Sequence, residues 1–224
     1  MKKGSQKQGI EKQKGGSGPG LNYHSAYNMA REKLAAGNVK DMALFSRCAF
    51  DEKGSRFEVP YFGDSLLVDF PGGEVYRAGG GEVSLTTAIL VLHYLTGASG
   101  LPPKGKLISF KELPGGEIYL EPFSHRVVNR LVRFFGRNPG RFLAAGKKLG
   151  GTKREYGDAS VTLWAFPLVP ITFVLWEGDE EFGPSATVLY DQTAPEHLAT
   201  EDLVVLAGDA VARLRTAAPG EEDR

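Results

Sequence analysis

One histidine lies within the most apolar helical segment of the sequence. His93 stands in the run of residues 90–95, where a buried imidazole needs a hydrogen-bond partner because an unpaired buried polar group costs about 1–3 kcal/mol. Two interpretations stay open. The ring is either a satisfied structural group, or it serves as an axial ligand for a metal or a tetrapyrrole or as a proton-transfer group. For a cofactor site, Tyr94 and Trp176 are the further candidate contacts.

Four carboxylates gather in residues 177–181, directly after an apolar stretch that predicts a strand. Glu177, Asp179 and Glu180 are the candidate metal ligands, because hard divalent cations prefer oxygen clusters and pockets often form at strand ends. The alternative is a solvated turn, since like charges this close repel one another. A metal-assisted hydrolase built on the cluster would draw further groups from His93, His125 or Asp191.

Two other features exclude whole classes of site. The segment of residues 100–107 is close to a phosphate-binding loop, but Leu107 stands where magnesium binding needs Ser or Thr, and two prolines remove backbone donors. The single cysteine, Cys48, excludes an internal disulfide and any four-cysteine zinc or iron–sulfur site from this chain alone. We expect Cys48 to be a buried small side chain and not a nucleophile.

Composition limits the partners. The 27 Lys and Arg residues balance 27 Asp and Glu residues, which argues against a broad basic face, so no specific nucleic acid is expected. The longest aliphatic run, residues 88–92, is far shorter than the roughly 20 apolar residues that span a bilayer. We therefore expect no membrane association and a cytoplasmic location.

Hydrophobic periodicity indicates which elements position these residues. It predicts helices over residues 22–37, 84–96, 123–135, 139–148 and 200–214. It predicts strands over residues 43–50, 56–62, 65–70, 74–77, 107–110, 118–120, 159–166, 171–176 and 186–190. The first four strands, separated by turn residues, form an antiparallel meander.

Strands in blocks with helices between the blocks indicate the α+β class, with a meander and central strands packed against helices. We expect a single domain over residues 21–215. Residues 1–20 carry five lysines and one glutamate and are expected to be a disordered basic tail, since little apolar surface offsets the entropy of ordering. Residues 216–224 are expected to be a disordered acidic tail.

Several segments together resemble the domain of unknown function 3786 family. They are residues 89–95, 107–116, 176–182, 189–191 and 198–202. The resemblance implies a protein of anaerobic bacteria and archaea, some of whose relatives carry a four-cysteine iron–sulfur module similar to that of corrinoid iron–sulfur proteins. This chain cannot hold such a cluster, so an iron–sulfur or corrinoid protein would be a partner. The family supplies no established catalytic residues.

Three functions therefore stay open. The first is a non-catalytic domain in anaerobic metabolism that binds a tetrapyrrole or corrinoid at His93, or serves as an accessory protein. The second is the metal-assisted hydrolase. The third is a protein–protein interaction module that docks through aromatic surface near Trp164 and Trp176. The sequence leaves open whether the protein catalyses a reaction.

Overall fold

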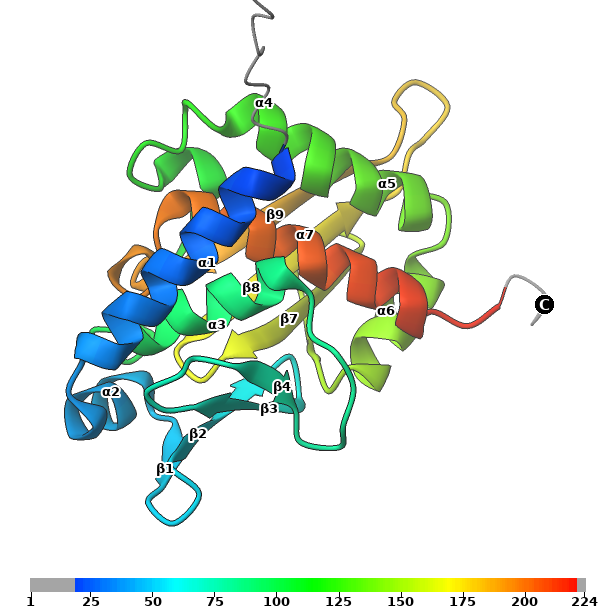
Figure 1. The fold of residues 1–224 in the computed structure, drawn as a ribbon. Coiled ribbons are helices and arrows are strands. Elements are labelled where there is room, and N and C mark those ends of the chain that lie inside the picture. The colour runs from blue at the N-terminus through cyan, green and yellow to red at the C-terminus, as the bar shows by residue number, and fades with distance from the viewer. Residues whose placement is uncertain (1–18, 221–224) are drawn as a thin grey trace, which may run out of the picture.

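The computed structural model describes residues 19–220 and confirms the α+β class (Figure 1). The helices are α1 (Pro19–Ala36), α2 (Val39–Ser46), α3 (Leu85–Gly97), α4 (Leu120–Phe123), α5 (Asn129–Phe135), α6 (Pro139–Lys148) and α7 (Thr200–Ala217). A π-helical turn occupies Ser124–Val128, and 3-10 turns occupy Phe110–Glu112 and Ala194–Glu196. The strands are β1 (Ala49–Asp51), β2 (Arg56–Tyr61), β3 (Asp64–Asp69), β4 (Val75–Arg77), β5 (Leu107–Ser109), β6 (Thr152–Arg154), β7 (Ala159–Phe166), β8 (Val169–Trp176) and β9 (Ser185–Asp191).

The first sheet is the expected meander, with strand order β1-β2-β3-β4 and antiparallel pairing throughout. Tyr61 pairs with Asp64, so β2 and β3 are joined by the two residues Phe62 and Gly63. Both have positive φ, 50° and 83°, which matches the twist of a tight hairpin. The two-residue turn Gly63-Asp64 that the sequence indicates is therefore shifted by one residue, because Asp64 already pairs in β3.

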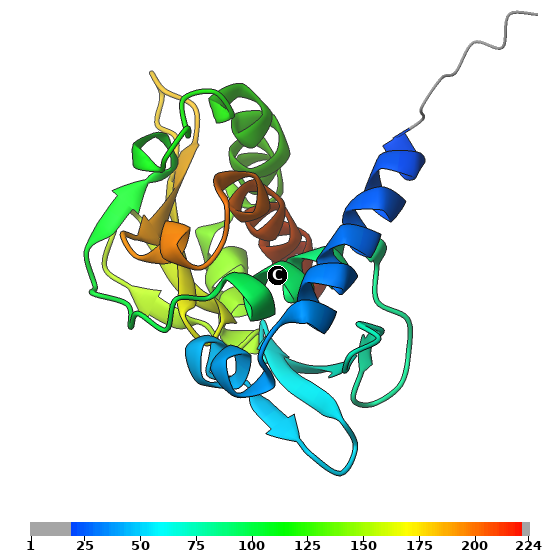
Figure 2. The ribbon, with the colours of Figure 1, turned by 60° about the vertical axis from the view of Figure 1, so that its left-hand side comes forward.

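The second sheet has the order β5-β9-β8-β7-β6, also antiparallel. Figure 2 shows this sheet and α1 on opposite sides of the molecule, with α3 and α7 between them. Helix α6 approaches β7 closely, because Gly146 has no side chain where the methyl groups of Val161 lie. The buried faces of the helices and both sheets form one continuous core.

Two predicted strands are wrong. Residues 43–46 form the second half of α2, and of the strand predicted over residues 43–50 only Ala49 and Phe50 lie in a strand, β1. The helix forms because Asn38 caps it: its side chain accepts hydrogen bonds from the backbone of Lys40 and Asp41. Residues 118–120 form turns that lead into α4. The short strand β6 was missed, since its three residues are all exposed and carry no apolar pattern.

The ends of the fold differ slightly from expectation. Helix α1 begins at Pro19, and α7 continues to Ala217, two residues into the expected acidic tail. Residues 1–18 and 221–224 lie outside the described part of the chain, so the tails and the domain limits stay predictions. Among residues 19–220, no helix is both long and apolar enough to cross a membrane.

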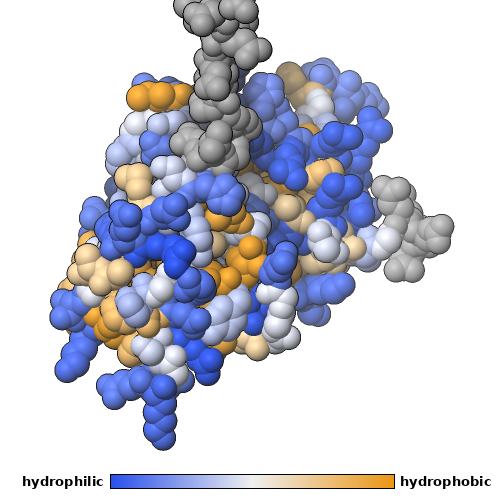
Figure 3. Space-filling model, in the orientation of Figure 1, coloured by the Kyte–Doolittle hydropathy of each residue, from blue (hydrophilic) through white to orange (hydrophobic). Residues whose placement is uncertain are grey.

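Helical spacing within residues 22–37 predicts an apolar stripe on this helix, and the buried side of α1 differs from it. The predicted stripe consists of Ala26, Met29, Ala30, Leu34 and Ala35. Ala30 and Leu34 are buried as expected, but Met29 is 67% exposed. Tyr27 takes part instead, and its hydroxyl donates a hydrogen bond to the Gly73 carbonyl of the meander at 2.9 Å. Figure 3 shows apolar residues near the middle of this face, over the start of α3 between α1 and α7.

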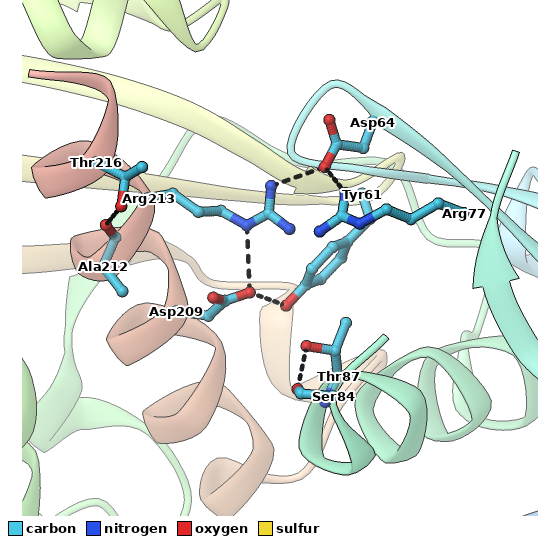
Figure 4. A network of polar contacts seen from close by, with 9 residues as sticks. All are labelled: Tyr61, Asp64, Arg77, Ser84, Thr87, Asp209, Ala212, Arg213 and Thr216. Carbon is cyan, nitrogen blue, oxygen red and sulfur yellow. Dashed lines mark hydrogen bonds and ion pairs between the residues drawn. The ribbon is translucent and has the colours of Figure 1, made fainter. Parts of the chain in front are cut away.

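A polar network joins the meander to α7 (Figure 4). The Asp64 carboxylate accepts hydrogen bonds from Arg77 at 2.7 Å and from Arg213 at 3.0 Å. Asp209 accepts from the Tyr61 hydroxyl at 2.6 Å and from Arg213 Nε at 3.3 Å. The Arg213 guanidinium also lies 4.9 Å from the centre of the Tyr61 ring. Side chains from two parts of the chain distant in sequence are therefore held together by charge-assisted bonds.

Candidate functional site

A groove of about 640 Å³ opens between α1, α3, the 3-10 turn Ala194–Glu196 and the start of α7. This volume lies within the range of small-molecule sites. Its apolar walls come mainly from Met29, Ala30, Pro195 and Leu198. Its polar groups are Lys33, His93, Glu196, His197 and Asp202.

The central pair of the groove is His93 and Asp202. Their Nδ1 and Oδ2 atoms lie 2.9 Å apart, and the side chains are 36% and 15% exposed. Ser84 sets the start of α3 by capping it, with its hydroxyl accepting from Thr87 N. Asp202 stands in the first turn of α7, where a carboxylate is favoured by the helix dipole. His93 lies in the third turn of α3, so the contact between α3 and the start of α7 brings the pair together.

The contact with Asp202 determines which ring nitrogen of His93 is free. In the neutral ring, a carboxylate at Nδ1 accepts its proton, and Nε2 then keeps a lone pair. Nε2 forms no hydrogen bond within residues 19–220, and it is not among the buried atoms that lack a partner. A lone pair at the edge of an apolar groove is suited to ligate a metal or to accept a proton.

A second histidine lines the same groove. His197 is only 2% exposed, and its Nδ1 accepts a hydrogen bond from Ser99 N at 3.3 Å. Its Nε2 is buried and has no partner among the described residues. Burial lowers the pKa of His197, although the Leu101 backbone and the charges of Glu196 and Asp191 oppose the shift. Burial therefore disfavours the charged form of this ring, which lines the same groove as His93.

The structure does not bring Tyr94 and Trp176 to this groove. Tyr94 is fully buried, and its hydroxyl donates to Ser46 O at 2.8 Å and accepts from Leu168 N at 3.2 Å. Its ring stacks on Phe166 with the centroids 4.2 Å apart. Trp176 ends β8 and is 39% exposed. Of the three cofactor candidates, only His93 lines the groove, and contacts from the other two stay predictions.

The acidic segment forms the exposed loop between β8 and β9. The Asp179 carboxylate accepts hydrogen bonds from Glu181 N and Phe182 N, at 2.8 and 2.6 Å, and these bonds hold its pKa below the usual range. Glu177 and Glu180 are exposed in the same loop. Within residues 19–220, no group of three His, Cys, Asp or Glu side chains is arranged to hold a metal ion. The metal site therefore stays a prediction that no gathered ligand set supports.

Other candidate residues have structural surroundings. Asp191 is buried and accepts hydrogen bonds from the backbone of Lys104, Gly105 and Thr193. It therefore organises the loop before β5. His125 is exposed in the π-helical turn. Cys48 is buried as expected, and burial raises its pKa to about 12.

The two tryptophans do not form one aromatic patch. Trp164 and Trp176 are 47% and 39% exposed. Trp164 pairs with Pro170 at one end of the β7–β8 ladder, while Trp176 lies at the other end. Six residues of β8 separate these positions, which at about 3.3 Å per residue is roughly 20 Å. A docking surface that includes both tryptophans would have to extend along most of the length of β8.

Comparison with known proteins identifies the family. The model of a domain of unknown function, DUF3786, matches residues 38–213. The chain belongs to the DUF3786 family. The matched segment includes His93, His197 and Asp202, whereas the groove wall from α1 precedes it. No curated protein and no solved structure matches the chain.

Sequence reasoning missed two residues of this DUF3786 groove, Asp202 and His197. Asp202 is 109 positions from His93, and no sequence spacing links residues on helices so far apart. His197 is isolated from the other histidines in the sequence, so nothing there singles it out. The one available signal was the position of Asp202 in the first turn of a predicted helix, where a carboxylate also serves the helix dipole. Only packing of α3 against α7 shows that the carboxylate faces an imidazole.

Proposed function

We propose that this DUF3786 protein is a non-catalytic ligand-binding domain whose groove holds a tetrapyrrole or corrinoid, with His93 Nε2 as the protein ligand to its metal. The observation that carries the proposal is the 2.9 Å contact between His93 Nδ1 and Asp202, which leaves Nε2 free in a groove with apolar walls. When bound, such a group supplies a metal centre that the side chains themselves do not provide.

The donor set of the groove fits a macrocycle better than a free metal ion. A zinc ion takes three or four side-chain ligands, and the described residues gather no such set. A tetrapyrrole or corrinoid would bring four nitrogen donors of its own, so a single imidazole, that of His93, would be enough to hold its metal. The apolar side chains of Met29, Ala30, Pro195 and Leu198 suit the flat body of such a ring.

Asp202 is the positioning residue in this proposal. A metal-ligating histidine commonly donates its other ring N–H to a carboxylate, which orients the ring and raises its basicity. Asp202 holds His93 in that way from the first turn of α7. Its side chain is 15% exposed, so water competes little for the contact.

The wider role is proposed from the family resemblance. An accessory domain in anaerobic metabolism, located in the cytoplasm, would receive its ligand from, or present it to, an iron–sulfur or corrinoid protein. The one cysteine of the chain is buried with its pKa raised to about 12. A cluster-bearing component would therefore be a separate protein.

Anoxic absorption titrations test the proposal. Haemin and hydroxocobalamin are added separately to the full chain and to the variants His93→Ala, Asp202→Asn and His125→Ala. The unchanged protein should shift the absorption band of one of them at a 1:1 ratio. His93→Ala should abolish this shift, and Asp202→Asn should weaken binding by about 10–100-fold.

His125→Ala is the matched control, because His125 is exposed outside the groove and its loss should leave the titration unchanged. The proposal is wrong if neither compound shifts with the unchanged protein. It is also wrong if His93→Ala and His125→Ala give the same curve as the unchanged protein.

A further inference from the structure

Charge is unevenly distributed along this chain, although it sums to zero. Residues 122–154 contain nine of the 27 Lys and Arg residues and no Asp or Glu. The rest of the chain is correspondingly acidic. Net charge therefore hides a local basic surface, and the structure shows where that surface lies.

Three arginines from this segment line one groove. Arg133, Arg137 and Arg141 surround a hollow of about 810 Å³ between α5, α6, the end of the β8–β9 loop at Pro184 and the segment after α7. None of the described residues that line it is a carboxylate. Within residues 19–220, neither Arg133 nor Arg137 forms an ion pair. Figure 3 shows hydrophilic surface over α5.

The basic surface extends along α6. A second hollow of about 260 Å³ is lined by Lys147 and Lys153, and Ala144 lines both hollows. The ten residues of α6 span about 15 Å at 1.5 Å per residue. We name the five cations of the two hollows the basic stripe: Arg133, Arg137, Arg141, Lys147 and Lys153. Two of them have partners in the chain, since Lys153 Nζ lies 3.6 Å from the exposed Glu155 carboxylate and Arg141 Nε donates to Pro219 O at 2.9 Å. The length of the stripe exceeds that of a single phosphate group.

The side chains of the stripe favour phosphates over a protein surface. Guanidinium groups match phosphate oxygens with two parallel hydrogen bonds. Protein interfaces instead have apolar, often aromatic centres. Within residues 122–154, no large hydrophobic side chain is exposed, and Phe134 is half-buried with Arg130 and Arg215 over its ring. The stripe therefore offers an acidic protein positive charge but lacks the exposed apolar side chains that form the centre of a protein interface.

We infer that the basic stripe binds the sugar–phosphate backbone of a single-stranded nucleic acid without reading its sequence. The stripe turns from α5 into α6 around Asn138. A flexible single strand can follow that turn, whereas duplex DNA is stiff over about 150 base pairs. Backbone binding is independent of sequence and agrees with the expectation that no specific nucleic acid is recognised.

Fluorescence anisotropy with a labelled 20-nucleotide single strand tests the inference, at several KCl concentrations. The double variant Arg133→Gln/Arg137→Gln should weaken binding by about tenfold at low salt. The slope of its plot of log affinity against log salt concentration should be smaller in magnitude by about 1.4, because each of the two lost phosphate contacts contributes about 0.7. The N-terminal lysines are the same in every variant, so a difference belongs to the stripe.

The matched control is Lys40→Gln/Lys53→Gln, which removes two exposed charges from α2 and the β1–β2 turn. Its binding should stay within about twofold of the unchanged protein.

Three results would overturn the inference. The first is no binding by the unchanged protein at low salt, and the second is an equal loss in the stripe and control variants. The third is competition by polyglutamate or by ATP, each added so that its concentration of carboxylate or phosphate groups equals the phosphate concentration of the strand. Competition by polyglutamate would assign the stripe to an acidic protein, and competition by ATP would assign it to a small nucleotide. Circular dichroism of each variant verifies that the fold is unchanged.

Discussion

The two histidines of the groove differ because their hydrogen bonds differ. His93 donates through Nδ1 to Asp202 and keeps Nε2 at an accessible edge. His197 accepts through Nδ1 from the Ser99 backbone, and its Nε2 is buried without a partner among the described residues. An unpartnered buried nitrogen costs about 1–3 kcal/mol. His93 therefore has a ring nitrogen available to a ligand, whereas burial disfavours the charged form of His197.

Replacing His197 should remove part of the pH dependence of stability. Burial lowers the pKa of His197 in the folded protein, so the unfolded chain binds a proton first as the pH falls below about 6.5. The free energy of unfolding should then decrease from pH 7 toward pH 5. Urea unfolding should show a smaller decrease for His197→Asn, which keeps an acceptor for Ser99 N. Equal decreases in both proteins would contradict the prediction.

Cys48 should be unreactive in the folded protein. Burial raises its pKa to about 12, against the effect of the hydrogen bond with Ser46, and the thiolate is the reactive form. Iodoacetamide at pH 8 should leave the native chain unmodified and alkylate it completely in 8 M urea, as measured by intact mass. Rapid alkylation without urea would show that the thiol is accessible.

At the scale of elements, close helix packing depends on small residues in particular places. Gly146 of α6 lies against β7, where an added Cβ would meet Val161 methyl carbons at 2.7 Å. Gly208 of α7 has no atom within 4 Å of such a Cβ. Both are helical glycines, so they share the same propensity gain on substitution by alanine but differ in available space.

This pair makes a matched test of packing. Gly146→Ala should lower the free energy of unfolding by about 1–3 kcal/mol, because the added methyl overpacks the α6–β7 contact. Gly208→Ala should raise it by about 0.5–1 kcal/mol through helix propensity alone. Urea unfolding measures both. A stabilised Gly146→Ala would show that α6 shifts away from β7 at little cost.

At the scale of the molecule, the network around Arg213 joins the meander to α7. Arg213 is 17% exposed on its side chain and contacts Asp64, Asp209 and the Tyr61 ring. Helix α7 also carries Asp202, so the network and the groove depend on the same helix. Fixing α7 against the meander therefore helps to hold the His93–Asp202 pair in place.

Removing the Arg213 guanidinium should destabilise the whole fold. Arg213→Met keeps much of the apolar stem but leaves the partly buried carboxylates of Asp64 and Asp209 without this cation, at a cost of about 2 kcal/mol. Chemical denaturation should show a lower midpoint with an unchanged slope. The control is Arg215→Met. Arg215 is on the same helix, and its guanidinium lies over the Phe134 ring, so this substitution should cost less than about 1 kcal/mol.

The same network predicts a loss of stability in acid. Burial alone would raise the pKa of Asp64, but hydrogen bonds from Arg213 and Arg77 hold it below its ordinary value. The stabilising contribution is thus present above about pH 4, where the unfolded group titrates, and is lost as the pH falls through the lower folded pKa. Asp64→Asn should show a smaller loss of stability between pH 5 and pH 2, and an identical loss would exclude the contribution.

Much of this protein is determined locally and is therefore visible in the sequence. The meander, the capped start of α3 at Ser84 and the strands β7 and β9 follow from turn residues, a helix cap and apolar alternation, which act over a few positions. Where local signals conflict, sequence reasoning fails. The apolar residues after Asn38 suit a strand, yet the Asn38 cap makes them a helix, and the exposed strand β6 exists only because β7 offers an edge.

The candidate site belongs to tertiary structure. His93 stood out in the sequence because of its apolar neighbours, but its partner Asp202 is 109 residues away and is brought to it by packing of α3 near α7. The basic stripe was likewise hidden by a net charge of zero. A net charge summed over the chain does not show where the charges lie. The free energy of a charge or of a bound ligand depends instead on the groups within a few ångströms of it.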